Sequence, residues 1–201
     1  MRGPYPAVAV TGGVGCGKSE VGQILRAAGV AVLDADAVVH ELLAADRAVQ
    51  AAVVNLCGPS VRSADGSMDR RAIARQIFEN ADQRRALEAI LHPRVWDRIQ
   101  AWRSTERTRV GCAALIPLLF EAGLTEGWTE MWCVVASDEI VEKRLLARGW
   151  STAEIALRRG AQWPVGQKSA RADCVIENNG SLESLRECVL RYWNHLMERS
   201  M

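Results

Sequence analysis

The sequence lacks several of the signals by which large classes of protein are recognised. Its longest apolar run, residues 112–120, is too short to span a bilayer. Residues 1–6 carry no apolar core of a signal peptide. None of the six cysteines belongs to a C-x-x-C pair, so the sequence does not indicate a zinc site. We therefore expect a cytoplasmic protein with reduced cysteines and no membrane partner.

Excess charge is also absent. The 201 residues include 25 lysines and arginines against 24 aspartates and glutamates, which gives a formal net charge of +1. A general nucleic-acid-binding protein would be strongly basic, so we expect no nucleic-acid partner. Lysine itself is scarce, and the chain has only Lys18, Lys143 and Lys168. The bias toward arginine suits bidentate phosphate binding, but a genome-wide compositional bias would produce it equally well.

A phosphate-binding loop stands out near the N-terminus. Residues 12–19 read GGVGCGKS, which fits the pattern G-x-x-x-x-G-K-[ST]. Glycines let the backbone turn with positive φ, so that successive N–H groups point at an anion. Lys18 is placed to reach the β- and γ-phosphates, and the Ser19 hydroxyl to ligate Mg²⁺. The residues expected to bind the nucleotide here are Gly13, Val14, Gly15, Cys16, Gly17, Lys18, Ser19 and Glu20.

The context of the loop predicts its fold. Residues 7–10 before it are an apolar run typical of a buried strand, and Val21, Ile24 and Leu25 after it fall on one helical face. Further short apolar runs alternate with helical patterns. We predict the α/β fold of a P-loop NTPase, a three-layer α/β/α arrangement with a five-stranded parallel sheet. The other four predicted strands are residues 30–33, 112–116, 131–135 and 174–176.

Residues 37–108 show an almost wholly helical pattern, which is too long for a plain crossover between two strands. Within it we expect helices over 46–56, 69–78, 86–91 and 95–102, with a break at His92-Pro93. We predict one domain over residues 1–201 with three parts. These are a nucleotide core (1–36, 109–142 and 172–201), a helical substrate-binding subdomain (37–108) and a lid (143–171).

Acids and arginines flank the predicted site. Asp34 and Asp36 follow the second strand, at the sheet edge that also carries the phosphate loop. Either acid could take part in the chemistry or cap the next helix. We consider capping for Asp34 and favour Asp36 for chemistry. The arginine-rich stretch after the fourth strand suits a lid that closes on phosphates. No Asn-Lys-x-Asp signature of GTPases occurs, so these features together describe a small-molecule kinase.

Six segments resemble those of dephospho-coenzyme A kinases, in the same order and over nearly the whole chain. They are residues 11–19, 34–36, 69–71, 91–93, 117–121 and 172–180. The resemblance implies the last step of coenzyme A synthesis, in which ATP with Mg²⁺ phosphorylates the ribose 3′-hydroxyl of dephospho-coenzyme A, giving coenzyme A and ADP. Another small-molecule kinase, of the nucleoside monophosphate or shikimate type, and a non-enzymatic nucleotide switch are the alternatives. We expect a monomer, with a homotrimer as the alternative state.

The resemblance also implies roles for single residues. Asp36 is similar to the family acid that accepts or orients the ribose hydroxyl, and Lys18 and Arg144 complete the catalytic set. Further ATP-binding candidates are Arg148, Asn178 and Asn179, and the substrate-binding candidates besides Asp36 are Arg70, Arg71, His92, Leu118 and Glu121. The alternatives are solvated helix charges for the two arginines of the lid, a helix-break residue for His92, and an ordinary turn at 178–180.

Two loop residues depart from the family pattern, which usually has Ser at position 16 and Thr at position 20. Glu20 places a carboxylate beside Ser19, where it either weakens triphosphate binding or contacts the metal through water. Cys16 lies at a helix N-terminus and near Lys18, which favours the thiolate. We predict that Cys16 is the most readily alkylated cysteine, unless its sulfur is turned away from solvent.

Overall fold

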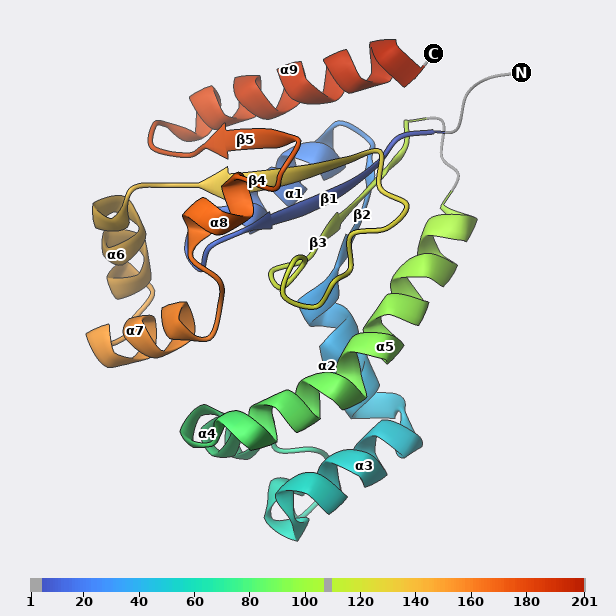
Figure 1. Cartoon of the computed structure of the whole chain (residues 1–201), viewed down its shortest axis with the longest axis vertical. Helices are drawn as coiled ribbons and strands as arrows, with labels where there is room; N and C mark the ends of the chain where they lie inside the picture. The colour runs from blue at the N-terminus through green and yellow to red at the C-terminus, as the bar shows by residue number, and fades with distance from the viewer. Residues whose placement is uncertain (1–4, 107–109, 201) are drawn as a thin grey trace. The chain divides into compact units, whose positions relative to one another are not determined.

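The computed structural model describes residues 5–106 and 110–200 (Figure 1). These residues form two compact units, one made of residues up to Asp34 and from Trp102 onward, the other of Ala35–Ala101. The predicted boundary between residues 108 and 109 lies outside the described residues. The roles assigned to the three predicted parts stay predictions.

The first unit is built on a five-stranded parallel sheet, as predicted. Its strands are β1 (Ala7–Gly12), β2 (Ala31–Asp34), β3 (Cys112–Leu115), β4 (Glu130–Val135) and β5 (Cys174–Glu177). Their order is β2-β3-β1-β4-β5, and all four pairings are parallel. Every residue of the central strand β1 is buried, because it has a strand on each side and helices over both faces. All five carboxyl ends therefore meet at one edge, where β1 runs into the phosphate loop.

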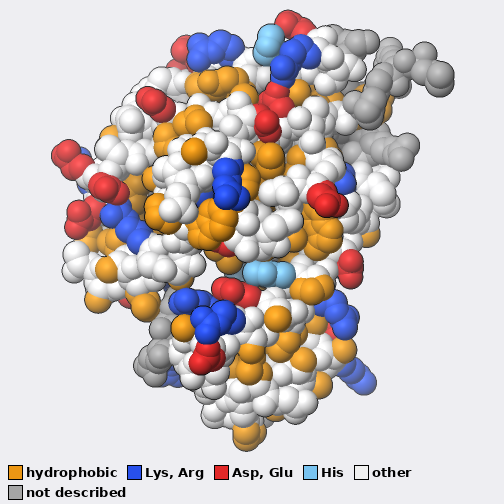
Figure 2. All heavy atoms as spheres, in the orientation of Figure 1, with side chains coloured by type: hydrophobic (Ala, Val, Ile, Leu, Met, Phe, Trp, Pro, Cys, Tyr) orange, Lys and Arg blue, Asp and Glu red, His pale blue; other side chains and the backbone are white. Residues whose placement is uncertain are grey.

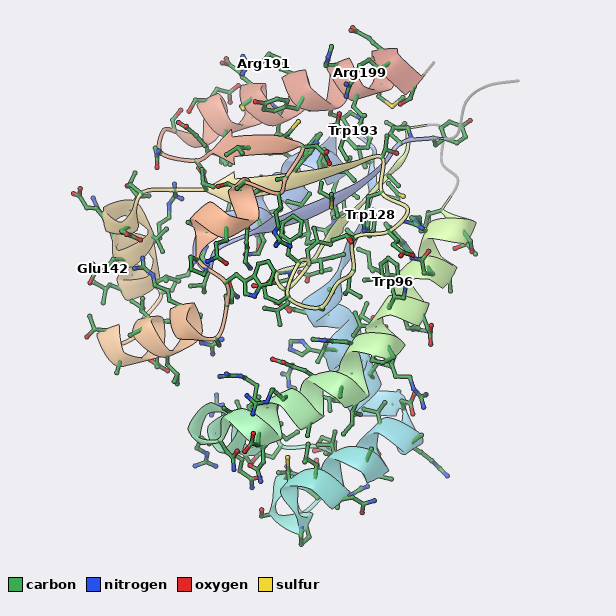
Figure 3. All side chains as sticks on the ribbon, viewed as in Figure 1. Trp96, Trp128, Glu142, Arg191, Trp193 and Arg199 are labelled. Carbon is green, nitrogen blue, oxygen red and sulfur yellow. The ribbon has the colours of Figure 1, made fainter. Side chains whose placement is uncertain are left out.

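Helices cover both faces of this sheet. They are α1 (Lys18–Ala27), α8 (Val165–Ser169) and α9 (Leu182–Ser200). Two more helices of this unit, α6 (Asp138–Ala147) and α7 (Thr152–Gly160), lie beyond the carboxyl ends of the strands (Figure 1). Helix α1 packs on α9 and on the strands behind the sheet in the view of Figure 1, while α8 lies in front against β1 and β4. Trp193 points from α9 toward the strands (Figure 3), and its ring meets Trp132 edge-on with centroids 6.1 Å apart. Both indoles belong to the apolar core on this side of the sheet.

The second unit is helical. It contains α2 (Ala35–Ala45), α3 (Arg47–Cys57), a 3₁₀ turn (Pro59–Val61), α4 (Arg70–Glu79) and the greater part of α5 (Ala81–Thr105). The predicted starts of two helices are confirmed by caps. Asp46 accepts hydrogen bonds from the amides of Ala48 and Val49, and Asp69 does the same for Arg71 and Ala72, all at 2.9–3.0 Å.

The predicted helix break at His92-Pro93 is wrong, because α5 continues through Pro93. The buried residues Leu87, Leu91, Val95 and Ile99 recur every fourth position on both sides of the proline. This stripe packs as one face, and its burial offsets the lost backbone hydrogen bond and the steric strain that proline causes inside a helix. Pro93 itself is exposed.

Replacing Pro93 by Ala should therefore stabilise the protein. Alanine restores a backbone donor and removes the ring clash, which stabilises the folded state. It also increases the conformational entropy of the unfolded chain, which offsets part of this stabilisation. The free energy of unfolding should therefore rise by about 1–2 kcal/mol. Urea unfolding followed by circular dichroism measures the change. A lower unfolding free energy for Pro93→Ala would show that the ring makes a stabilising contact that its exposure argues against.

Candidate active site

The phosphate loop lies between the end of β1 and the start of α1, as its motif requires. Gly17, the residue before the first turn of α1, has φ 105°, and a Cβ atom there would lie 2.1 Å from Asn178 Nδ2. A Cβ atom at Gly12 would lie 2.2 Å from the carbonyl oxygen of Val134 in β4. Both glycines are therefore demanded by close approach of other chain segments as well as by the turn.

The two polar side chains of the motif, Lys18 and Ser19, follow directly on the glycine turn. Lys18 Nζ donates to the carbonyl oxygens of Gly12 and Gly13, at 3.0 and 2.8 Å, so the ammonium group lies over the loop itself. Ser19 is exposed in the first turn of α1. An anion seated on the loop would meet the ammonium group, the N-terminus of α1 and the Ser19 hydroxyl.

Asn178, just beyond β5, braces the loop. Its Nδ2 donates to the carbonyl oxygen of Cys16 at 2.8 Å, and the residue is 5% exposed. Arg144 of α6 donates from Nη2 to the backbone and side-chain oxygens of Asn178, at 3.0 and 3.3 Å. Within the described part of the chain, Arg144 Nη1 is buried and has no hydrogen-bond partner. This arginine is thus oriented by Asn178 and keeps one nitrogen available for a ligand.

A second arginine, Arg148, is the C-terminal cap of α6 and forms an ion pair with Glu20. Arg148 Nη2 is 3.2 Å from Glu20 Oε1, and both side chains are partly exposed. The two residues line a cavity of about 100 Å³ together with residues of the loop, of the segment after β5 and of α9. The remaining lining residues are Gly15, Gly17, Arg144, Asn178, Gly180, Leu182 and Leu185. All predicted nucleotide residues except Asn179 therefore lie in the loop or at this cavity.

Asn179 serves the start of α6 instead. Its Oδ1 accepts a hydrogen bond from the amide of Ser137 at 2.8 Å, one residue before the helix begins. This contact fixes the segment after β4 to the segment after β5. The structure thus gives both asparagines of the predicted turn a definite partner.

A larger cavity, of about 280 Å³, adjoins the other side of the loop. Gly13, Val14 and Cys16 line it from the loop, and Arg159, Gln162 and Trp163 line it from the end of α7 and the segment after it. Gln162 Oε1 is buried without a hydrogen-bond partner among the described residues. These three residues fall in the predicted lid (143–171), but none of them was assigned a role of its own. The arginine-bearing helix around position 159 was the signal that could have pointed to them.

Glu121, a predicted substrate residue, takes part in a buried ion pair. Its Oε1 lies 2.7 Å from Nζ of Lys168, a side chain with no solvent exposure, and accepts the amide of Trp163 at 2.9 Å. Lys168 also donates to the carbonyl oxygen of Pro117 at 2.7 Å. Glu121 thus fixes α8, through Lys168, and the segment before it, through Trp163, to the turn after β3. The same turn contains the half-buried Leu118. Glu121 Oε2 is buried and lacks a partner within the described ranges.

Cys16 is 2% exposed, and its sulfur packs against Gly13, where a Cβ atom would approach it to 3.0 Å. The structure therefore supports the alternative in which Cys16 is a small substitute for Ser with its sulfur turned from solvent. Burial also raises the pKa values of the Cys133 and Cys174 thiols to about 11, so both stay protonated at neutral pH. Our expectation that Cys16 is alkylated first does not take this packing into account.

The predicted acceptor residues of the helical unit lie on three of its helices. Asp36 is exposed in the first turn of α2, two residues beyond the end of β2. Arg70 and Arg71 begin α4 and are exposed, and His92 is half-buried in α5. Asp34 is the last residue of β2 and immediately precedes α2, the position at which a capping residue would stand.

Two features are absent from the described residues, 5–106 and 110–200. No helix there is both long and apolar enough to cross a membrane. No group of three His, Cys, Asp or Glu side chains there could hold a metal ion. On the face that Figure 2 shows, basic and acidic side chains are interspersed. The cytoplasmic location and the monomeric state stay predictions.

The phosphate loop joins the first strand of a parallel sheet to the first helix, and two arginines lie beside it. This arrangement defines a P-loop nucleotide-binding protein. Comparison with known proteins narrows this class. A family model described as Dephospho-CoA kinase matches residues 6–184. The chain belongs to the dephospho-CoA kinase family.

Relatives of known name agree with this assignment. The chain is 41% identical over 191 residues to the dephospho-CoA kinase of Symbiobacterium thermophilum, covering 92% of this chain and 79% of the relative. It is 40% identical over 185 residues to that of Parasynechococcus marenigrum, covering 92% and 93%. A crystal structure of a Thermus thermophilus protein superimposes with a TM-score of 0.78 at 36% identity, covering 95% of this chain and 97% of the other.

The brace between Asn178 and the loop predicts a binding phenotype. Asn178→Ala leaves the Cys16 carbonyl without its donor and frees Arg144, so we expect a loss of about 1–3 kcal/mol in stability. MgATP should bind about tenfold more weakly or worse, because the loop amides are no longer held ready for the phosphates. Isothermal titration calorimetry measures the change in Kd.

Asn194→Ala is the matched control, since Asn194 is exposed on α9. It removes the same amide group from the same unit and should leave the Kd for MgATP within about twofold. Equal Kd values for Asn178→Ala and the wild type would show that the hydrogen bond from Asn178 to the loop does not prepare the loop for MgATP.

Proposed function

We propose that this chain transfers a phosphoryl group from ATP to the ribose 3′-hydroxyl of dephospho-coenzyme A, giving coenzyme A and ADP in the last step of coenzyme A biosynthesis. Membership of the dephospho-CoA kinase family over residues 6–184 carries the proposal. The braced phosphate loop supports it, because a loop of this kind is the structural requirement for binding the donor nucleotide.

The phosphates of ATP would be bound by groups from the phosphate loop, from α1 and from α6. Backbone amides of the loop and Lys18 hold the β- and γ-phosphates. Arg144, oriented by Asn178, has the buried Nη1 that needs an acceptor, and a phosphate oxygen would supply one. In a phosphoryl transfer, positioning and charge stabilisation do most of the catalytic work, so a fixed guanidinium here would favour the transition state.

The donor set of this unit fits a magnesium ion that arrives with the nucleotide. Ser19 offers an exposed hydroxyl in the first turn of α1, whereas no cluster of three metal-binding side chains exists among the described residues. Mg²⁺ favours few protein ligands together with phosphate oxygens and water, which this arrangement suits. When bound, the ion would neutralise charge on the phosphates, and Ser19 is the residue that we propose to hold it.

On the acceptor side, we assign Asp36 the task of holding the ribose hydroxyl and receiving its proton. The residue is exposed, so its carboxylate can be reached by a substrate. Arg70, Arg71, His92, Leu118 and Glu121 remain proposed contacts for dephospho-coenzyme A. In Glu121, one carboxylate oxygen is already held by Lys168 and the Trp163 amide, so a substrate contact would use the other oxygen.

A screen of acceptors tests the proposal. Purified protein with MgATP should release ADP when dephospho-coenzyme A is added, and release little with AMP, shikimate or no acceptor. A coupled spectrophotometric assay for ADP measures the difference. Stimulation by AMP or shikimate instead would make the chain another small-molecule kinase, and equal slow hydrolysis in all samples would favour a nucleotide switch.

The two acids after β2 should differ in the same assay. Asp36→Asn should lower kcat by about 10²-fold or more, the usual size for loss of a positioned base, with a modest change in KM for ATP. Asp34→Asn is the matched control, because it removes the same charge two residues away, and it should reduce kcat less. A larger kcat loss for Asp34→Asn would reverse the two assignments.

A further inference from the structure

Glu20 places a negative charge directly beside the phosphate loop. It lies in the first turn of α1, and its Oε2 faces the loop, 3.5 Å from where a Cβ atom of Gly17 would stand. The side chain is 32% exposed and its Oε1 is held by Arg148. The carboxylate therefore lies beside the positively polarised end of α1, where the phosphates of a nucleotide would also be attracted.

An uncompensated carboxylate at this position would oppose the binding of a polyanion. Like charges a few ångström apart at a protein surface repel appreciably, and the repulsion grows with the charge of the ligand. Arg148 is the cation that the structure places on this carboxylate, at 3.2 Å, and both side chains line the cavity of about 100 Å³. The neighbouring Arg144 differs, because it is anchored to Asn178 and retains a buried nitrogen for a ligand.

We infer that Glu20 and Arg148 act as one neutralised pair, in which Arg148 cancels the charge of Glu20 and thereby permits a nucleoside triphosphate to bind. This inference rests on the proposed function, in which the loop holds the phosphates of ATP. It makes Arg148 a positioning residue that acts through Glu20, and leaves direct contact with the phosphates to Arg144 and Lys18. The pair sets the preference of the site for ligands of different phosphate charge.

A double-mutant cycle tests this coupling. Isothermal titration calorimetry gives the Kd for MgATP, without acceptor, for the wild type, Glu20→Thr, Arg148→Ala and the double variant. Arg191→Ala is the charge-matched control, since Arg191 is exposed on α9 (Figure 3) and its removal subtracts the same unit charge from the same unit. Circular dichroism verifies that every variant is folded.

Arg148→Ala should weaken MgATP binding about tenfold, because it leaves the Glu20 carboxylate uncompensated. Glu20→Thr should tighten binding about twofold, since Arg148 then adds its positive charge. The double variant should return to within about threefold of the wild type, and Arg191→Ala should stay within about twofold. A double variant as weak as Arg148→Ala would overturn the inference, because Arg148 would then act on the nucleotide independently of Glu20.

The charge of the ligand gives a second readout that a merely structural role would not change. The weakening caused by Arg148→Ala should be about tenfold for ATP and less than about threefold for AMP, which carries fewer negative charges near the loop. Equal weakening for both ligands would contradict charge cancellation. Failure of the wild type to bind MgATP at all would instead reject the proposed function, so the two failures are distinct.

Discussion

A single buried amide group holds the phosphate loop to the elements beside it. The hydrogen bond from Asn178 to the Cys16 carbonyl joins the segment after the edge strand β5 to the loop after the central strand β1, across 162 positions of sequence. Because the same side chain also accepts from Arg144, it ties α6 to the loop as well. Gly17 is required by this contact, since any Cβ atom there would collide with the amide. The loop, the arginine and the cavity beside them therefore depend on one group.

The positive charges near the loop are held in different ways. Lys18 lies over the carbonyl oxygens at the start of the loop, and Arg144 is anchored on Asn178. Lys168 is fully buried against Glu121 and fixes α8, the helix whose Val165 packs on Gly13. A buried ion pair adds little net stability over apolar packing, but removal of one partner is costly. Lys168 thus secures geometry near the loop, whereas Lys18 and Arg144 remain suited to meeting phosphate.

Much of the fold and of the loop could be predicted from the sequence because their signals are local. The glycine pattern before Lys18, the five short apolar runs and the capping residues Asp46 and Asp69 each determine the structure of adjacent residues. The predicted helix break at Pro93 is wrong because the local helix-breaking signal of proline competes with a stripe of buried residues that continues on both sides of Pro93. Burial of such a face depends on tertiary packing, which the local signal does not contain.

The contacts that shape the candidate site are mostly non-local and were largely missed. Nothing near Asn178 in the sequence indicates that its side chain reaches Cys16, or that Lys168 is buried against Glu121. The burial of Cys16 likewise results from chain segments that are distant in sequence, whereas its predicted reactivity came from its neighbours alone. The roles of Asp36, Arg70, Arg71 and His92 stem from the family resemblance and stay predictions.

The central claim is that the transferred phosphoryl group ends on one hydroxyl of the acceptor. Two-dimensional phosphorus–proton correlation spectra of the product of ATP and dephospho-coenzyme A test it most directly, because the spectra identify the proton to which the new phosphorus is coupled. We expect a new phosphomonoester coupled to the ribose 3′ proton, together with one equivalent of ADP. Coupling to the 2′ proton, or a phosphate on the pantetheine hydroxyl, would contradict it.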